Sequence, residues 1–387
     1  MTVSPSRLAR CLIALLLLAV AGYFAPGVWQ RYLAFLSARS APLYQPRERV
    51  SGGNEPPAPR VDPALEQLDI RALEAAARYA ATQGSQALIV ARHDHIVFER
   101  YWQGTDFDTL TNAQSFTPLL AALATGVAVG HRRIGWADEP VGVLLEEWRQ
   151  DPRGAITVRA LLQSSSGLAP EDDLNAAPDL TAALLARPLA GPPGVTRVEQ
   201  PADAQLLALL IERATRSRYA EFLSGALWRR LGAADAWLWL DRAGGTAHAA
   251  CCMFAHQGDW IRVGQMLLRD GSYRGSQVLR PGWVELMRMP ARGDADYGSF
   301  LALALRPQPG SEAYASRDVY SVAGRGGNRL WLVPSLQLAI LCTAAAAARP
   351  ATFDETRIPN LIMRGARDYL PPAALPGADL SPLVPGH

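Results

Sequence analysis

The sequence contains no lysine, because all 38 basic residues of this 387-residue chain are arginine. Any chemistry that the protein performs must therefore proceed without a lysine base. The chain also lacks a strong net charge, since 36 acidic residues leave a balance of +2. Such a balance gives no reason to expect nucleic acid as a partner. With 49% hydrophobic residues, the chain is long enough to bury a large core.

Cysteine is also scarce, with only Cys11, Cys251, Cys252 and Cys342 present. Cys251 and Cys252 are neighbours, and adjacent cysteines rarely satisfy the geometry of an ordinary disulfide. No cysteine or histidine spacing is typical of a zinc site. We therefore expect no disulfide framework, no metal and no cofactor, and we interpret the cysteines as small buried hydrophobic residues.

A charge-free apolar run extends from Cys11 to Trp29 and follows Arg7 and Arg10. Its length is close to that of a bilayer-spanning helix, and the preceding arginines favour export of the rest of the chain. We expect residues 1–30 to form a membrane anchor, with the domain on the periplasmic or extracytoplasmic side. A cleavable signal peptide is the alternative, because residues 19–21 read Ala-Val-Ala, and cleavage would give a secreted protein.

Residues 31–66 are rich in proline and glycine and predict an extended spacer. Residues 67–370 form the expected domain, and the Pro-rich residues 371–387 form a tail. Within the domain, hydrophobic periodicity predicts helices over 70–84 and 115–130 and two helical segments over 203–230. A hairpin is predicted over 87–101, and four strands lie between residues 300 and 342. This order predicts an α+β fold, in which an antiparallel sheet is flanked by helices and interrupted by a mostly helical subdomain.

Several segments resemble the serine β-lactamase and penicillin-binding-protein superfamily, in the branch that includes esterases and nylon-oligomer hydrolases. Residues 111–117 read Thr-Asn-Ala-Gln-Ser-Phe-Thr, where that branch has Ser-x-x-Lys-Ser-Phe-Thr. Residues 227–232 resemble its Leu-Trp-x-Pro-Leu-Gly, and residues 250–253 and 259–260 also match the branch. The resemblance covers about residues 70–345. It implies the β-lactamase/transpeptidase-like fold, with a nucleophilic serine and a lysine one helical turn apart.

The resemblance places substituted residues at each catalytic position. Thr111 stands at the nucleophile, Gln114 at the lysine and Glu199 at the tyrosine. A neutral glutamine cannot accept the proton of the nucleophile. Glu199 could act as a base only if it reached Thr111. A glycine-rich substrate-binding strand, by contrast, is retained at Gly324, Arg325, Gly326, Gly327 and Asn328.

Three functions follow from this pattern. The first is a catalytically impaired family member that keeps a ligand-binding cleft at the cell envelope, where a small ester, amide or peptidoglycan-like molecule would bind. The second is an active esterase or amidase that uses Thr111 as its nucleophile. The third is a structural envelope protein without a ligand. The neutral Gln114 favours the first, because drift from lysine to arginine would have left a cation there.

Overall fold

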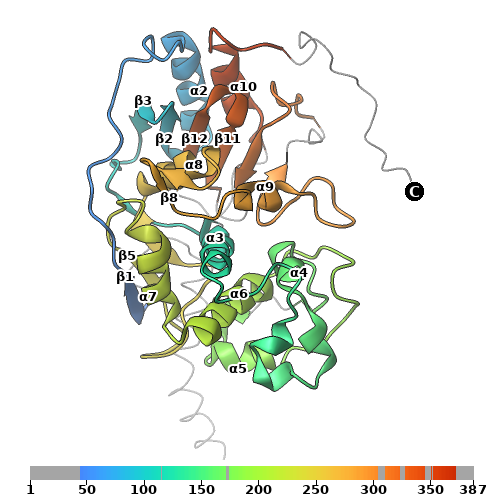
Figure 1. Ribbon diagram of the computed structural model, residues 1–387. Helices are drawn as coiled ribbons and strands as arrows, with labels where there is room; N and C mark the ends of the chain where they lie inside the picture. The colour runs from blue at the N-terminus through green and yellow to red at the C-terminus, as the bar shows by residue number, and fades with distance from the viewer. Residues whose placement is uncertain are drawn as a thin grey trace, which may run out of the picture.

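The structure is a computed structural model that describes residues 44–114, 116–170, 174–303, 310–322, 327–344, 350 and 352–371. The described part has an α+β architecture, as the sequence predicts. In Figure 1 a large sheet and its covering helices occupy the upper half, a mostly helical region occupies the lower half, and α3 lies between them.

The large sheet has six strands, all antiparallel, in the order β3-β2-β12-β11-β10-β9. The strands are β2 (Ser85–Arg92), β3 (His95–Tyr101), β9 (Ala302–Leu303), β10 (Tyr320–Val322), β11 (Arg329–Val333) and β12 (Leu338–Ala344). The early hairpin β2–β3 therefore pairs with the late strand β12. This arrangement confirms a sheet that is completed late in the sequence, around a long insertion.

Helices cover both faces of this sheet. On one face, α2 (Ile70–Thr82) packs with α10 (Arg357–Arg364) and buries an apolar stripe that includes Leu73, Ala77 and Ala80. Asp69 caps α2 by accepting a hydrogen bond from the backbone N–H of Arg71. On the other face, α8 (Asp259–Leu268) lies against β11 and β12. The short α9 (Trp283–Arg288) follows the small hairpin of β7 (Ser272–Tyr273) and β8 (Ser276–Gln277).

The inserted region is mostly helical, as predicted. Its helices are α3 (Phe116–Gly130), α4 (Val158–Leu162), α5 (Leu180–Leu185), α6 (Pro201–Thr215) and α7 (Tyr219–Leu223), the last continuing as a π-helix over Ser224–Trp228. The predicted helices correspond to α3, α6 and α7, whereas α4 and α5 were not predicted. The helix α6 contacts α3, α4 and α5. Almost every residue of α3 is buried, which agrees with its uniformly apolar sequence. The boundaries expected for the first two helices, 70–84 and 115–130, agree with α2 and α3 to within two residues.

A second sheet was not predicted, and it corrects the expected spacer over residues 31–66. Its order is β1-β5-β6-β4, formed by β1 (Arg47–Val50), β4 (Leu110–Asn112), β5 (Ala236–Trp239) and β6 (Met253–His256). The strand β1 pairs antiparallel with β5, so residues 44–66 are part of the globular body. Proline and glycine exclude a helix here but not an edge strand, whose pairing partner is about 190 residues away in the sequence.

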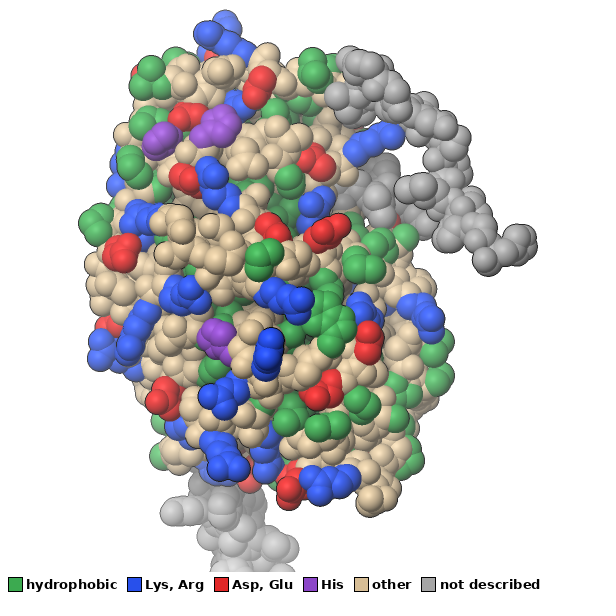
Figure 2. Space-filling model, viewed as in Figure 1, with side chains coloured by type: hydrophobic (Ala, Val, Ile, Leu, Met, Phe, Trp, Pro, Cys, Tyr) green, Lys and Arg blue, Asp and Glu red, His purple; other side chains and the backbone are tan. Residues whose placement is uncertain are grey.

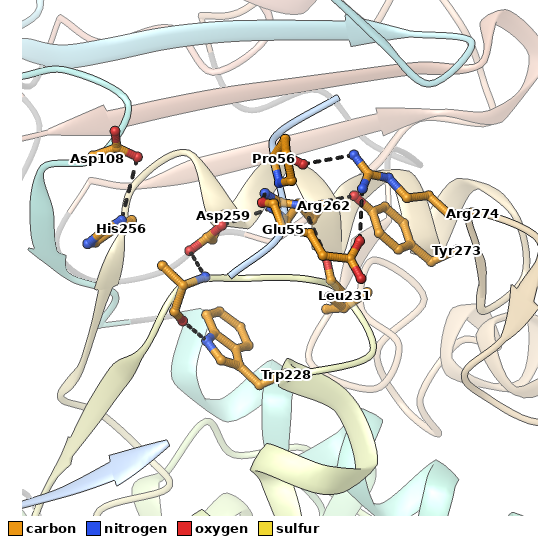
Figure 3. A network of polar contacts seen from close by, with 11 residues as sticks. Glu55, Pro56, Asp108, Trp228, Leu231, His256, Asp259, Arg262, Tyr273 and Arg274 are labelled. Carbon is orange, nitrogen blue, oxygen red and sulfur yellow. Dashed lines mark hydrogen bonds and ion pairs between the residues drawn. The ribbon is translucent and has the colours of Figure 1, made fainter. Parts of the chain in front are cut away.

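A buried ion pair fixes this segment to the body (Figure 3). Arg262 donates from Nε to Asp259 Oδ1 at 2.9 Å and from Nη2 to the carbonyl oxygen of Glu55 at 2.6 Å. Asp259 also accepts a 2.9 Å hydrogen bond from the backbone N–H of Ala234. Burial raises the pKa of Asp259, and these partners oppose that effect. Asp259 and Trp260 are the helix-start and core residues that the sequence predicts.

Among the described residues, no helix is both long and apolar enough to cross a membrane. The expected anchor over residues 1–30 and the first part of the spacer lie outside the described residues, as do residues 372–387 of the expected tail. Membrane attachment therefore stays a prediction.

Candidate active-site region

The segment that carries the nucleophile position is a strand and a turn. Thr111 lies in β4, opposite Ala255 of β6. The side-chain Oδ1 of Asn112 accepts a 3.0 Å hydrogen bond from the backbone N–H of Gln114, whose φ is 45°. Strand pairing and this Asx turn occupy the backbone groups that a helix would need.

The structure therefore corrects the expected helical setting of the motif. The helix α3 begins at Phe116, after both Thr111 and Gln114, so the two side chains do not lie one turn apart on a helical face. Ser115 lies outside the described residues. Ala113 donates a 2.7 Å backbone hydrogen bond to Met253, which fixes the turn to the second sheet.

One end of the glycine-rich element reaches this segment. Gly324, Arg325 and Gly326 lie outside the described residues, whereas Gly327 and Asn328 precede β11. Asn328 donates weakly from Nδ2 to the carbonyl oxygens of Asn112 and Ala113, at 3.4 and 3.5 Å. Its Oδ1 accepts a 3.1 Å hydrogen bond from the backbone N–H of Ala344. The buried Asn328 thus brings the nucleophile-position segment beside the start of β11 and the end of β12 in the large sheet.

Glu199 is not brought to Thr111. Its side chain is 67% exposed and lies 3.7 Å from Arg197, with which it forms an ion pair. No hydrogen bond joins Glu199 to Thr111, although both residues are described. The next helix begins at Pro201, in the N1 position, where a missing backbone donor costs little. The contact required for Glu199 to act as a base is therefore absent from the structure.

Arg197 connects the Glu199 loop to the segment after α9. It contacts Asp294 at 3.4 Å, and its guanidinium carbon lies 3.7 Å from the centre of the Tyr297 ring. Burial raises the pKa of the Tyr297 hydroxyl, and the neighbouring Arg197 opposes this shift. Sequence reasoning missed this group, because residues 289–303 contain none of the motifs that carry the family resemblance.

A buried carboxylate beneath the Glu199 loop was also missed. Asp203 is completely buried at the start of α6, and it interacts with Ser166 and with Gln200, whose Nε2 lies 3.4 Å from Oδ1. Its other oxygen, Oδ2, has no hydrogen-bond partner among the described residues. Desolvation by burial raises its pKa to about 7. The available signal was its position on an otherwise apolar helical face, next to Ala202 and three residues before Leu206.

The serines at 164–166 form the structural turn that the sequence indicates. All three are buried, and Ser164 adopts φ 52°. Their backbone carbonyl groups hold the loop that carries Glu199, because Ser165 accepts from the N–H of Gly194 and Ser164 from the N–H of Val198, both at 2.7 Å. This turn therefore positions the loop.

The prediction about the adjacent cysteines was wrong in one respect. Cys251 and Cys252 are buried, as expected, but they form a disulfide with each other. Cys252 adopts φ 70°, and this tight turn brings the two sulfur atoms together. Cys342 is buried and lies 3.2 Å from the hydroxyl of Ser85. In the part of the chain that the structure describes, no three His, Cys, Asp or Glu side chains are grouped to hold a metal.

Comparison with known proteins identifies the class. The β-lactamase family model matches residues 71–359, about three quarters of the chain, so this chain belongs to the β-lactamase family of serine hydrolases. Within it, 86 residues are 41% identical to the 6-aminohexanoate-dimer hydrolase of Paenarthrobacter ureafaciens. That match covers 22% of this chain and 21% of the hydrolase.

Solved structures share the fold. A Bacillus anthracis protein assigned as a 6-aminohexanoate-dimer hydrolase aligns with a TM-score of 0.68 and 17% identity, covering 83% of this chain and 90% of that one. A penicillin-binding-protein homologue from Caulobacter crescentus gives 0.58 and 15%, covering 75% and 96%. The hydrolase EstCE1, which has promiscuous acyltransferase activity, gives 0.60 and 16%, covering 78% and 99%. The family resemblance inferred from the motifs is confirmed.

Proposed function

We propose that this β-lactamase family member binds a ligand at the family's catalytic position without hydrolysing it. The observation that carries the proposal is the placement of Thr111 in strand β4, ahead of α3 and without a base in hydrogen-bond contact among the residues that the structure describes. A hydroxyl nucleophile needs a neighbouring base or a lowered pKa to attack an acyl carbon. Gln114 supplies neither, and the carboxylate of Glu199 is engaged with Arg197.

The rim of the proposed binding surface supports a ligand with apolar and polar parts. Val195 and Val198 are exposed on the Glu199 loop, and Met289 is exposed on the facing segment. Arg197 and Tyr297 join these two segments. Exposed apolar side chains around a fixed polar pair are a common feature of ligand sites. A small ester, an amide or a peptidoglycan fragment combines these chemical features.

The proposal places the domain outside the cytoplasm, held by residues 1–30. The support is the charge-free run after Arg7 and Arg10. A fusion of alkaline phosphatase to the C-terminus should be active, and the chain should sediment with membranes. An inactive fusion would contradict the orientation, and recovery of the shortened chain in the soluble fraction would indicate cleavage.

Turnover and binding measurements on the purified full-length chain separate the three functions. The chain is incubated with chromogenic short-chain esters and a fluorescent penicillin, and binding is followed by fluorescence anisotropy. We expect saturable, reversible binding and no covalent label. Turnover or labelling that disappears in Thr111→Ala but persists in Ser115→Ala would instead establish an active hydrolase. Absence of both binding and turnover, with isolated peptidoglycan also tested, would support a structural protein.

A further inference from the structure

An open hollow of about 500 Å³ lies at the far end of α3 from Thr111. Its wall combines the end of α3 with residues near 230 and with residues 277–280, and the cationic or titratable members are His131, Arg132, Arg230 and Arg280. A helix of 15 residues is about 22 Å long. The hollow is therefore separate from the candidate active-site region.

No carboxylate lines this hollow, and none of its three arginines forms an ion pair within the described ranges. Two guanidinium groups are held in place by neutral contacts. Arg230 donates to the carbonyl oxygens of Gln277 and Val278, at 2.6 and 3.4 Å. The guanidinium carbon of Arg280 lies 4.7 Å from the centre of the Trp136 ring. These contacts orient the two cations while leaving their charge uncompensated, which lowers the entropy cost of binding an anion.

The dipole of α3 explains the position of only one of the three arginines that line the hollow. Arg132 follows the C-terminus of α3 and adopts φ 56°, and a cation is favourable there. Arg216 directly follows α6, which also has 15 residues, and adopts a similar φ of 57°. Only at α3, however, is the arginine joined by Arg230 and Arg280 from distant segments. On the face of the molecule drawn in Figure 2, basic and acidic side chains are interspersed.

We propose that this hollow, defined by Arg132, Arg230 and Arg280, binds a phosphate group. Guanidinium groups match phosphate oxygens in pairs of parallel hydrogen bonds, and three of them suit a dianion or a phosphodiester. The phosphate belongs either to a soluble phosphate ester or to an anionic lipid headgroup.

Binding to the purified full-length chain tests the proposal. Titration calorimetry of the detergent-solubilised chain with inorganic phosphate and pyrophosphate probes the soluble source, and the same titration with short-chain phosphatidylglycerol or short-chain phosphatidylcholine probes the lipid source. Arg132→Gln and Arg280→Gln should each weaken binding about tenfold, the loss expected for one charge-assisted hydrogen bond. Arg216→Gln is the matched control and should bind like the wild type. Thermal melting verifies that every variant is folded.

Binding that is weakened in Arg132→Gln and Arg280→Gln but not in Arg216→Gln supports the site. The probe that binds in this way shows whether the phosphate belongs to a soluble ester or to a lipid headgroup. Binding of neither probe would overturn the proposal, and so would an equal loss in Arg216→Gln, because it would indicate attraction to surface charge in general. Raising the salt concentration should weaken binding to the wild type more than to Arg132→Gln. Neither result depends on whether Thr111 is catalytic.

Discussion

Replacing Asp203 with asparagine should change how stability depends on pH. The carboxyl group is completely buried, and burial raises its pKa from an ordinary 3.8 to about 7. Asparagine has nearly the same shape and carries no charge at any pH. It therefore imitates the protonated aspartic acid that the folded state favours.

The sign and the size of the effect follow from proton linkage. Between pH 4 and pH 7, Asp203 keeps its proton in the folded state but releases it in the unfolded chain. The free energy of unfolding of the wild type therefore falls by about 1.4 kcal/mol for each unit by which the pH rises. The contribution of Asp203 is fully present below its ordinary pKa and is lost as the pH rises through about 7. A shift of roughly three units corresponds to a total of about 4 kcal/mol.

Guanidinium chloride unfolding, followed by tryptophan fluorescence at pH 5, 6, 7 and 8, measures this contribution. Asp203→Asn should already be more stable than the wild type by about 1.6 kcal/mol at pH 5, and this advantage should grow by about 1.4 kcal/mol per pH unit until it levels off near 4 kcal/mol above pH 7. Asp138→Asn is the control, because Asp138 is exposed, and its ion pair with Arg159 lowers its pKa. That variant should follow the wild type over this range. Parallel curves for Asp203→Asn and the wild type would refute the reasoning.

Three further substitutions test the packing. Arg262→Met should lower the free energy of unfolding by about 3–5 kcal/mol, because it leaves the carboxylate of Asp259 buried without its cation. In chemical unfolding, adding Asp259→Asn to the same chain should restore part of this loss. Gly126→Ala places a methyl carbon 2.4 Å from the Trp283 indole and should cost about 1–3 kcal/mol, seen as a lower Tm; an unchanged Tm would contradict the packing of α3 on α9. Asn328→Ala should lower the free energy of unfolding by about 1–3 kcal/mol, because it leaves the backbone N–H of Ala344 in β12 without its acceptor. Hydrogen exchange at that N–H should become faster, and an unchanged or slower exchange would contradict this role.

The sequence predicted those parts of the fold in which the hydrophobic pattern and the local structure agree. The helix α2 carries a regular apolar stripe, and the hairpin β2–β3 has two apolar runs around a polar turn. Both are local features, so their residues are sufficient to indicate them. The antiparallel sheet and its helical insertion follow from the order of such elements.

The second sheet could not be predicted in the same way, because its pairings are not local. The strand β1 lies in a Pro-rich segment, and its partner β5 is far along the chain. The strand β4 lies in a motif whose family resemblance implies a helix, and the turn made by Asn112 decides against it. Short-range sequence patterns cannot predict whether a segment forms a helix or a strand when tertiary contacts decide between the two.

In the candidate site, too, some features were predicted from the sequence and others depend on tertiary contacts. The resemblance identified the three substituted positions, and the structure brings Asn328 beside one of them. The resemblance could not show that Arg197 forms an ion pair with Glu199, since neither residue belongs to a helix or a strand. Asp203 was missed because a single aspartate near the start of a helix is typical of a solvated first turn. In the folded chain Asp203 is instead completely buried beside Ser166 and Gln200.

Intact-mass spectrometry tests the central claim most directly. The full-length chain is incubated with a fluorescent penicillin and with a chromogenic ester, quenched in acid and weighed, alongside Thr111→Ala. The structure predicts an unchanged mass for both proteins, because Thr111 lies in β4 and no base in the described part of the chain contacts it. An acyl adduct on a peptide containing Thr111, absent from Thr111→Ala, would contradict the account and establish a threonine nucleophile.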